Sequence, residues 1–395
     1  MGLVFVGNIH VDKLDGLYRD AFGWDQTKLD AVHLAIGCYL CPRWPGRPSP
    51  AWATLIGPPS CGKSTILLMF DGFPFTVSVD HLTRNALTSC YSDEENPTED
   101  HSFFHKLAVS NRPEGEKVWI IQELSSLMSA DHITLEKQLA DLRAAHVGKH
   151  SSHGGMGGTR VREIGSFGMV VGTTEAFELI RARMSTFGDR FLSIRMALEN
   201  DTPEAIIADA ETAWRANSSR MESAKRAIRD ETHLILSRGI DHIKALANSD
   251  CSRSVEQERV LSAWSAIHST FSTCPVSPTI MVTASGRPFR IVEQVKAWGN
   301  THATICGRAE WTEAEMRIAR RVFQDSMPRT NFDALSALWP SGLRQAFANA
   351  DLYRQWSVLG AVETSDGRRI EYGRDNGAQL TTPYRRMIAE SGYLQ

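Results

Sequence analysis

The residues with the clearest chemical signature form one glycine-rich stretch, Gly57-Pro58-Pro59-Ser60-Cys61-Gly62-Lys63-Ser64-Thr65. It matches the phosphate-binding pattern G-x-x-x-x-G-K-[ST] at every fixed position. The glycines let backbone N–H groups turn toward a phosphate at the N-terminus of a helix. Lys63 supplies a positive charge, and the Ser64 hydroxyl is a ligand for Mg²⁺. The stretch therefore predicts a binding site for ATP and Mg²⁺.

The segments on either side of this stretch have the composition that such a loop requires. Residues 51–56 are short, apolar and typical of a buried strand, and residues 64–70 continue as a helix. A strand, a glycine-rich loop and a helix in this order are the structural context of the motif.

A second candidate site residue, a carboxylate, follows the apolar run 117–121, and this run predicts another buried strand. The run ends at Gln122 and Glu123, where parallel sheets place ligand groups. A nucleotide-hydrolysing site needs an acid for Mg²⁺ and a base for the attacking water. Two consecutive acids are usual, so Glu123 alone has to serve as metal ligand, as base or as both. Asp80, after the alternating run 75–79, is either a second acid or a helix N-cap.

Two further polar groups follow short apolar runs. Thr173 and Thr174 end the predicted strand 168–172, where a hydroxyl can bond the γ-phosphate or the attacking water. The segment 187–195 reads as a strand that carries Arg190. Arginine stabilises charge on a transferring phosphoryl group, in cis or from a neighbouring subunit; a surface ion pair is the alternative.

Composition limits the class of protein. The 395 residues, with 42% hydrophobic residues, allow two or three domains with a substantial core. The net charge of −3 predicts that any contact with DNA is local. No apolar run approaches the roughly 20 residues of a membrane span, and the first residues do not resemble a signal peptide. We therefore expect a cytoplasmic protein without membrane contact. The seven cysteines fit reduced thiols, and the Cys38/Cys41 pair lacks the second pair that a zinc site needs.

A glycine-rich tract, residues 148–158, follows an amphipathic helical pattern over residues 133–147. Such a composition predicts a mobile loop. Lys149 and His150 in this loop are candidates for contact with DNA phosphates, and a passive surface loop is the alternative.

The order of these elements resembles an AAA+ ATPase. Four segments are similar to phage- and mobile-element AAA+ ATPases that are described as DNA helicases: residues 57–64, 122–126, 142–148 and 188–192. The resemblance spans roughly residues 30–380, although only the first segment is specific by itself. It implies that Thr173 or Thr174 senses the γ-phosphate and that Arg190 is an arginine finger for the next subunit. Residues 287–298 are similar to the sensor-2 helix of minichromosome maintenance helicases, with Arg290 as the arginine.

The C-terminal part predicts a small domain of its own. Helical patterns over residues 312–323 and 341–359 precede a β-prone stretch, 361–372, with Asp-Gly at its centre, which is a hairpin signal. This order looks like a winged-helix domain. Arg344 in its recognition helix and Arg368 and Arg369 at the wing tip are DNA-binding candidates, although winged helices also contact proteins.

The sequence thus predicts an α/β protein with an AAA+ P-loop core on a parallel sheet, a helical lid and a C-terminal winged helix. The expected boundaries are a helical lead-in at 1–50 that packs on the core, the ATPase core at 51–200, the lid at 201–310 and the winged helix at 311–395. The expected activity is that of an ATP-hydrolysing motor on DNA, a replicative helicase or translocase of a phage or mobile element. We expect it to act on single-stranded or forked DNA as a hexameric ring. A helicase loader and an ATP-gated DNA-binding regulator or defence ATPase are the alternatives, and a non-hydrolysing ATP binder is also permitted by the lone acid.

Overall fold

The computed structural model describes residues 11–44, 50–81, 87, 102–108, 117–124, 132–154, 158–177, 190–196, 218–245, 251–273, 289–339, 350–370 and 377–394. The chain forms two compact units. The first comprises Met1–Phe177, Ser193–Ser252 and Lys296–Glu315, and the second Glu178–Leu192, Arg253–Val295 and Met316–Gln395. None of the described helices is long and apolar enough to cross a membrane.

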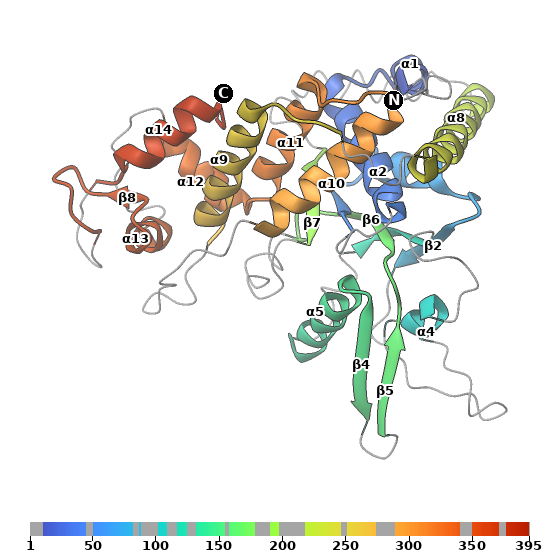
Figure 1. The fold of residues 1–395 in the computed structure, drawn as a ribbon, viewed down its shortest axis with the longest axis horizontal. Coiled ribbons are helices and arrows are strands. Elements are labelled where there is room, and N and C mark those ends of the chain that lie inside the picture. Colours follow the sequence, from blue (N-terminus) through green and yellow to red (C-terminus); the bar gives the residue numbers. More distant parts are fainter. Residues whose placement is uncertain are drawn as a thin grey trace. The chain divides into compact units, whose positions relative to one another are not determined.

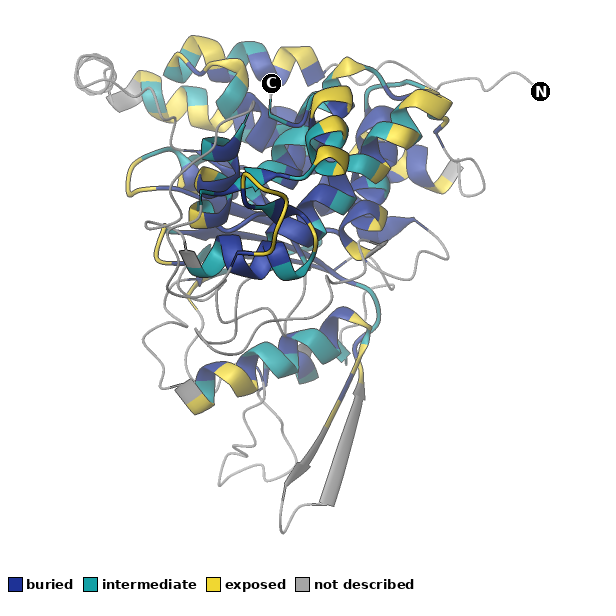
Figure 2. Ribbon diagram, turned by 90° about the vertical axis from the view of Figure 1, so that its left-hand side faces the viewer, coloured by how far each residue is buried: buried dark blue, intermediate teal, exposed yellow. Residues whose placement is uncertain are grey.

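The first unit is built on a five-stranded sheet. In spatial order its strands are β2 (Thr76–His81), β3 (Val118–Glu123), β6 (Gly168–Thr173), β1 (Trp52–Ile56) and β7 (Phe191–Arg195). Neighbours from β2 to β1 run parallel. Every residue of β1, β6 and β7 is buried, as continuous apolar runs in a parallel sheet require. The predicted α/β class is therefore confirmed, and all five predicted runs form strands, although residues 187–189 lie outside the described residues. Figure 2 colours the chain by burial, with buried residues in dark blue.

Helices α1 (Val11–Phe22), α2 (Gln26–Leu40), α3 (Lys63–Leu67) and α8 (Ser218–Ala245) belong to one layer of this unit. Asp25 caps α2 by accepting a hydrogen bond from the Lys28 backbone. α2 packs on β1 and β6, and its Tyr39 stacks on Phe70 in the short helix η2 (Leu68–Phe70) at 4.8 Å. A second short helix, η1 (Cys41–Arg43), follows α2. The N-terminal helices thus form part of the core around the sheet.

The opposite face of the sheet is covered by α4 (Phe103–Ala108) and α5 (His132–His146). Trp119 of β3 stacks on Phe104 of α4, and Trp52 of β1 packs edge-on against His146 of α5. Figure 1 shows these helices on the side of the sheet away from α2. Trp119 pairs with Met169 of β6, and Trp52 directly precedes Ala53, which pairs with Val170; the two tryptophans therefore lie on the same face of the sheet.

The glycine-rich tract does not form the predicted mobile loop. β4 (Lys149–Gly154) and β5 (Gly158–Glu163) pair as an antiparallel hairpin beside α5, from Lys149↔Glu163 to Gly154↔Gly158 (Figure 1). The prediction was wrong for residues 149–154 and 158, because their backbone is part of this paired ladder; residues 155–157 lie outside the described residues. Gly148, at φ +81°, turns the chain from α5 into β4.

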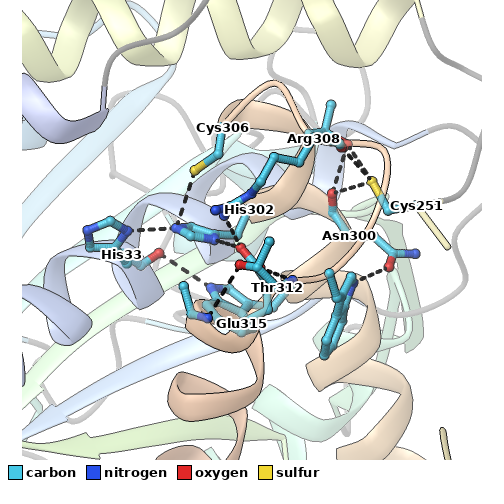
Figure 3. Close-up of polar contacts among 12 residues, drawn as sticks. His33, Cys251, Asn300, His302, Cys306, Arg308, Thr312 and Glu315 are labelled. Carbon is cyan, nitrogen blue, oxygen red and sulfur yellow. Dashed lines mark hydrogen bonds and ion pairs between the residues drawn. The ribbon is translucent and has the colours of Figure 1, made fainter. Parts of the chain in front are cut away.

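We call five polar residues of the first unit the histidine cluster: Asp15, His33, His302, Cys306 and Glu315 (Figure 3). They join α1 and α2 to the C-terminal half of α10 (Phe289–Ile305) and to the start of α11 (Glu313–Asp325). Asp15 Oδ1 lies 2.9 Å from His33 Nε2, and His33 Nδ1 lies 2.6 Å from His302 Nε2. His302 Nδ1 lies 2.6 Å from Glu315 Oε1, and Cys306 Sγ lies 3.8 Å from His302 Nε2.

The hydrogen bonds of this cluster require a charged imidazole. Both outer ring nitrogens face carboxylates, so each histidine donates outward, and a neutral imidazole has only one N–H. Nδ1 of His33 and Nε2 of His302 would then meet as two lone pairs at 2.6 Å, unless one extra proton lies between them. Burial opposes protonation of His302, but Cys306 and Glu315 outweigh burial and raise its pKa to about 10. Burial likewise opposes ionisation of Glu315, but His302 and Thr312 lower its pKa to about 2.

The second unit is mostly helical. It contains α9 (Val255–Phe271), most of α11, α12 (Arg329–Leu338), α13 (Ala350–Val358) and α14 (Thr382–Ser391). A capping box at Ser254 and Gln257 starts α9. Phe271 at its end packs edge-on against Trp356 of α13 at 4.9 Å, and Trp264 Nε1 donates to the Ser391 carbonyl of α14.

The predicted hairpin around Asp366-Gly367 has a different partner. β8 (Val362–Glu363) pairs with β9 (Gln379–Leu380), not with the residues directly after the turn. Thr364 closes a local turn instead, because its N–H donates to the Arg368 carbonyl and its hydroxyl accepts from the Arg368 N–H. The helical lid and the winged helix stay predictions.

Candidate functional site

The glycine-rich stretch forms a loop between the C-terminal end of β1 and the first residue of α3. Gly57 N–H donates to the Thr173 carbonyl at 3.2 Å, which ties the start of the loop to β6. Ser60, at φ +66°, is the single non-glycine residue in the described part of the chain with a positive φ, and Gly62 has φ +102°. Such left-handed conformations persist where surrounding contacts enforce them, and they often occur at functional sites.

The Lys63 ammonium lies inside the loop. Nζ donates to the carbonyls of Gly57 at 2.6 Å and Pro58 at 2.7 Å and contacts Cys61 Sγ at 3.7 Å. The residue is 7% exposed although it is charged. The loop carbonyls thus hold a cation at the N-terminus of α3, next to where backbone N–H groups can bind an anion.

The loop sits where the strand order of the sheet changes direction. β1 lies between β6 and β7, and neither follows it directly in sequence. In open α/β sheets, ligands bind at such a switch point, outside the carboxyl ends of the strands. The register Ile56↔Thr173 brings the hydroxyl-ended strand to the same edge as the loop.

Thr173 carries an unpaired buried hydroxyl. Its side chain is 0% exposed, and Oγ1 has no hydrogen-bond partner among the described residues. Thr54 Oγ1 in β1 shares this property. A buried polar group without a partner is costly and is often explained by a functional role. Thr174, one residue beyond the strand, is half-buried.

The pleat of β3 separates Gln122 from Glu123. Ile121 pairs with Val171, so two residues further on Glu123 lies on the same face as Thr173. Gln122 and Gly172 lie on the other face, where a Cβ atom at Gly172 would lie 2.9 Å from Leu67 of α3. Hence Gln122 is on the α3 side and Glu123 on the side of α4 and α5. Asp80 lies exposed in β2, within a strand and not at a helix N-cap.

The oxygen chemistry of Ser64 and Glu123 suits Mg²⁺. This ion uses one or two protein oxygens together with phosphate and water, so it does not need a cage of protein ligands. Groups of three or more His, Cys, Asp or Glu able to hold a metal are absent from the described residues. Cys38 and Cys41 are buried thiols, and burial raises the pKa of Cys38.

The two predicted arginines lie in the second unit. The Arg190 carbonyl accepts a hydrogen bond from Gln294 Nε2 of α10 at 3.3 Å, and Arg290 lies exposed in the first turn of α10. Their roles at a nucleotide stay predictions.

The DNA-binding candidates differ in exposure. Lys149 is exposed on β4 and pairs with Glu163 at 3.7 Å. His150 is 1% exposed, with Nε2 3.0 Å from Asp141, so the prediction of an accessible loop histidine was wrong. β-Pairing turns this residue inward, which composition could not indicate. Arg368 and Arg369 are exposed, and Arg344 lies outside the described residues.

Trp24 was not singled out from the sequence, yet it contacts the loop. The residue is 7% exposed, and its ring lies against Gly62. Its spacing with Tyr18 and Phe22 was the one available signal.

A scan against protein-family models and a search of curated proteins both find no match for this chain.

Proposed function

We propose that this chain is an ATP-hydrolysing AAA+ motor that acts on DNA, as a helicase or translocase of a phage or mobile element. The observation that carries the proposal is the loop Gly57–Thr65 at the switch point of the sheet, with the Lys63 ammonium held inside it. Phosphate binding at this place agrees with both the motif and the position of the loop.

Each residue of the site has a proposed role. Lys63 neutralises phosphate charge, and Ser64 supplies a hydroxyl oxygen for Mg²⁺. Glu123 holds and deprotonates water, and the Thr173 or Thr174 hydroxyl orients that water or the γ-phosphate. Mg²⁺, when bound, neutralises charge on the phosphate oxygens. Arg190 of a neighbouring subunit and Arg290 complete the site, which is why we propose a ring-forming homo-oligomer, a hexamer by resemblance.

The test is ATPase activity measured without nucleic acid, with single strands and with duplex, together with the mass of the assembly with a slowly hydrolysed ATP analogue. Lys63→Ala removes a charged partner of phosphate, for which a loss of roughly 10- to 100-fold in ATP affinity is expected. Lys225→Ala is the matched control, because Lys225 lies exposed on α8 in an ion pair with Glu222. Absence of ATPase activity under all conditions, with Lys63→Ala silent, would refute the motor.

The DNA part of the proposal depends on exposed cations. Lys149 on the hairpin and Arg368 and Arg369 near the β8 turn are exposed, which supports the proposed contact with phosphates. Each neutralised phosphate contributes about one unit to the slope of log affinity against log salt. Lys149→Ala should therefore reduce that slope by about one, and the double change Arg368→Ala/Arg369→Ala by about two.

The alternative is a helicase loader or an ATP-gated DNA-binding regulator. The exposed pair Arg368 and Arg369 favours this alternative, because the pair lies in the second unit and is far in sequence from the loop at 57–65. Strand displacement on forked DNA separates the possibilities: a motor unwinds the fork, a loader does not, and a regulator prefers one duplex sequence over random DNA.

A further inference from the structure

We propose that Trp24 is a positioning residue that holds the phosphate loop in its nucleotide-binding conformation. The proposal rests on the proposed function of that loop as an ATP site. It concerns a residue of the N-terminal helical segment, about thirty positions before the motif.

The indole lies directly against the residue that precedes Lys63. A Cβ atom at Gly62 would lie 2.6 Å from Cζ2 and 3.3 Å from Cη2 of Trp24. Contacts below 3.0 Å are not tolerated, so the ring occupies the space beside Gly62 up to van der Waals contact. Gly62 also has φ +102°, which disfavours any side chain. Both the Trp24 ring and the backbone conformation of Gly62 therefore exclude a side chain at position 62.

Trp24 is itself held by two aromatic neighbours, and we call Tyr18, Phe22 and Trp24 the aromatic brace. Tyr18 stacks on Trp24 with ring centroids 4.6 Å apart and planes 14° apart, and Phe22 lies 5.5 Å away. The Tyr18 hydroxyl contacts Met69 Sδ at 3.2 Å. Because Gly62 precedes α3 and Met69 follows it, the brace contacts both ends of this short helix.

The loop needs such support because its backbone is unusual. Ser60 and Gly62 adopt positive φ values within one turn of Lys63. Conformations of this kind persist when the surrounding structure enforces them. Removing the indole leaves a cavity beside Gly62 and lets the loop relax toward ordinary backbone conformations. The Lys63 ammonium then no longer converges on the phosphate-binding N–H groups.

The first experiment measures the loop without nucleotide. Cys61 lies half-buried in the loop, and Cys38 lies fully buried in α2 of the same unit. The rate of alkylation by iodoacetamide is followed at each cysteine by peptide mass spectrometry. In this reaction the Cys61 thiolate displaces iodide and forms a carbon–sulfur bond. We expect Trp24→Ala to accelerate Cys61 labelling at least about tenfold with Cys38 unchanged, and Trp24→Phe to stay within about threefold of the parent.

The Cys38 rate separates a local release from unfolding of the unit. If both cysteines react faster in Trp24→Ala, the tryptophan acts on the whole unit and the proposal is overturned. If neither rate changes, the loop is held without Trp24 and the proposal is likewise overturned. Tyr18→Phe keeps the stack and removes the contact with Met69, so its Cys61 rate reports the contribution of that contact.

The second experiment uses MgATP. Nucleotide is expected to protect Cys61 in the parent protein, and Trp24→Ala is expected to raise KM about tenfold with kcat changed less than threefold, since bound phosphate re-forms the loop. A KM unchanged in Trp24→Ala, in a protein that hydrolyses ATP, overturns the positioning role. If MgATP neither binds the parent protein nor protects Cys61, the proposed function is refuted. The nucleotide-free labelling of Cys61 then still tests whether Trp24 holds the loop.

Discussion

Raising the pH from 6.5 to 8.5 should destabilise the first unit through the single residue His302. In the folded chain its imidazole lies between His33, Glu315 and Cys306, and its pKa is raised to about 10. In the unfolded chain the histidine pKa is about 6.5. The stabilisation is therefore complete below pH 6.5 and is lost as the pH rises toward 10. Two other charged groups lie here: Asp15 of the cluster contacts His33, and Arg308 forms an ion pair with Glu315.

The magnitude follows from the proton count. Between the two pKa values the folded state holds one proton that the unfolded state lacks, so stability falls by about 1.4 kcal/mol per pH unit. From pH 6.5 to 8.5 the integrated loss is about 2 kcal/mol, since the unfolded histidine is still half-protonated at the start. Cys38 adds to the loss only above about pH 8.5, because burial raises its pKa above that of the unfolded thiol.

The assay is urea unfolding at several pH values, followed by a brief alkylation pulse at one fixed pH. Labelling of Cys38, which is buried in α2, reports unfolding of the first unit alone. His302→Gln should remove the pH dependence, and it should cost roughly 1–3 kcal/mol at pH 6.5, because Glu315 loses this partner but keeps Arg308 and Thr312. Glu315→Gln should shrink the dependence. A flat profile in the parent, or a parallel fall in His302→Gln, would refute the shared proton.

Three further results are expected. Gly62→Ala should abolish ATP binding, because the new methyl group meets Trp24 at a left-handed backbone; an isothermal titration checks this, and unchanged affinity would contradict it. Gly299→Ala should cost about 1–3 kcal/mol in urea unfolding, since its Cβ would lie 2.1 Å from Cζ2 of Trp311. Glu123→Gln should leave ATP affinity within about threefold and slow hydrolysis by roughly 10²–10⁴-fold, and rapid turnover in this variant would exclude Glu123 as the base.

The sheet was predictable because its signals are local. The runs at 52–56, 118–121 and 168–172 are mostly apolar, and every residue in them is buried in the folded chain. The loop at 57–65 was predictable for the same reason, since its motif indicates a turn between a strand and a helix. The contact between Trp24 and Gly62 joins residues far apart in sequence. No spacing rule connects them, so this part of the site required the fold.

Two predictions were wrong because the composition of a segment does not indicate which strand it pairs with. Residues 148–158 are rich in glycine, but glycine at a hairpin tip and glycine along a flexible loop give the same count. The turn at Asp366-Gly367 was located correctly, whereas its strand partner was not, because Thr364 satisfies the hydrogen bonds that an adjacent strand would otherwise take. In both cases the deciding interaction is a backbone hydrogen bond to a partner that periodicity does not identify.

The fold separates the two roles that the sequence allows for Glu123, the lone acid of the candidate site. From the sequence, Glu123 could be a metal ligand or a base. The register sets Gln122 on the face of α3, the helix that carries Ser64, and sets Glu123 on the face of Thr173. A group on the Thr173 face is suited to holding water beside a hydroxyl, and a neutral amide on the α3 face offers Mg²⁺ a carbonyl oxygen without charge. This division supports the proposed role of Glu123 as the base, and under that proposal Mg²⁺ would be held more by phosphate oxygens than by protein carboxylates.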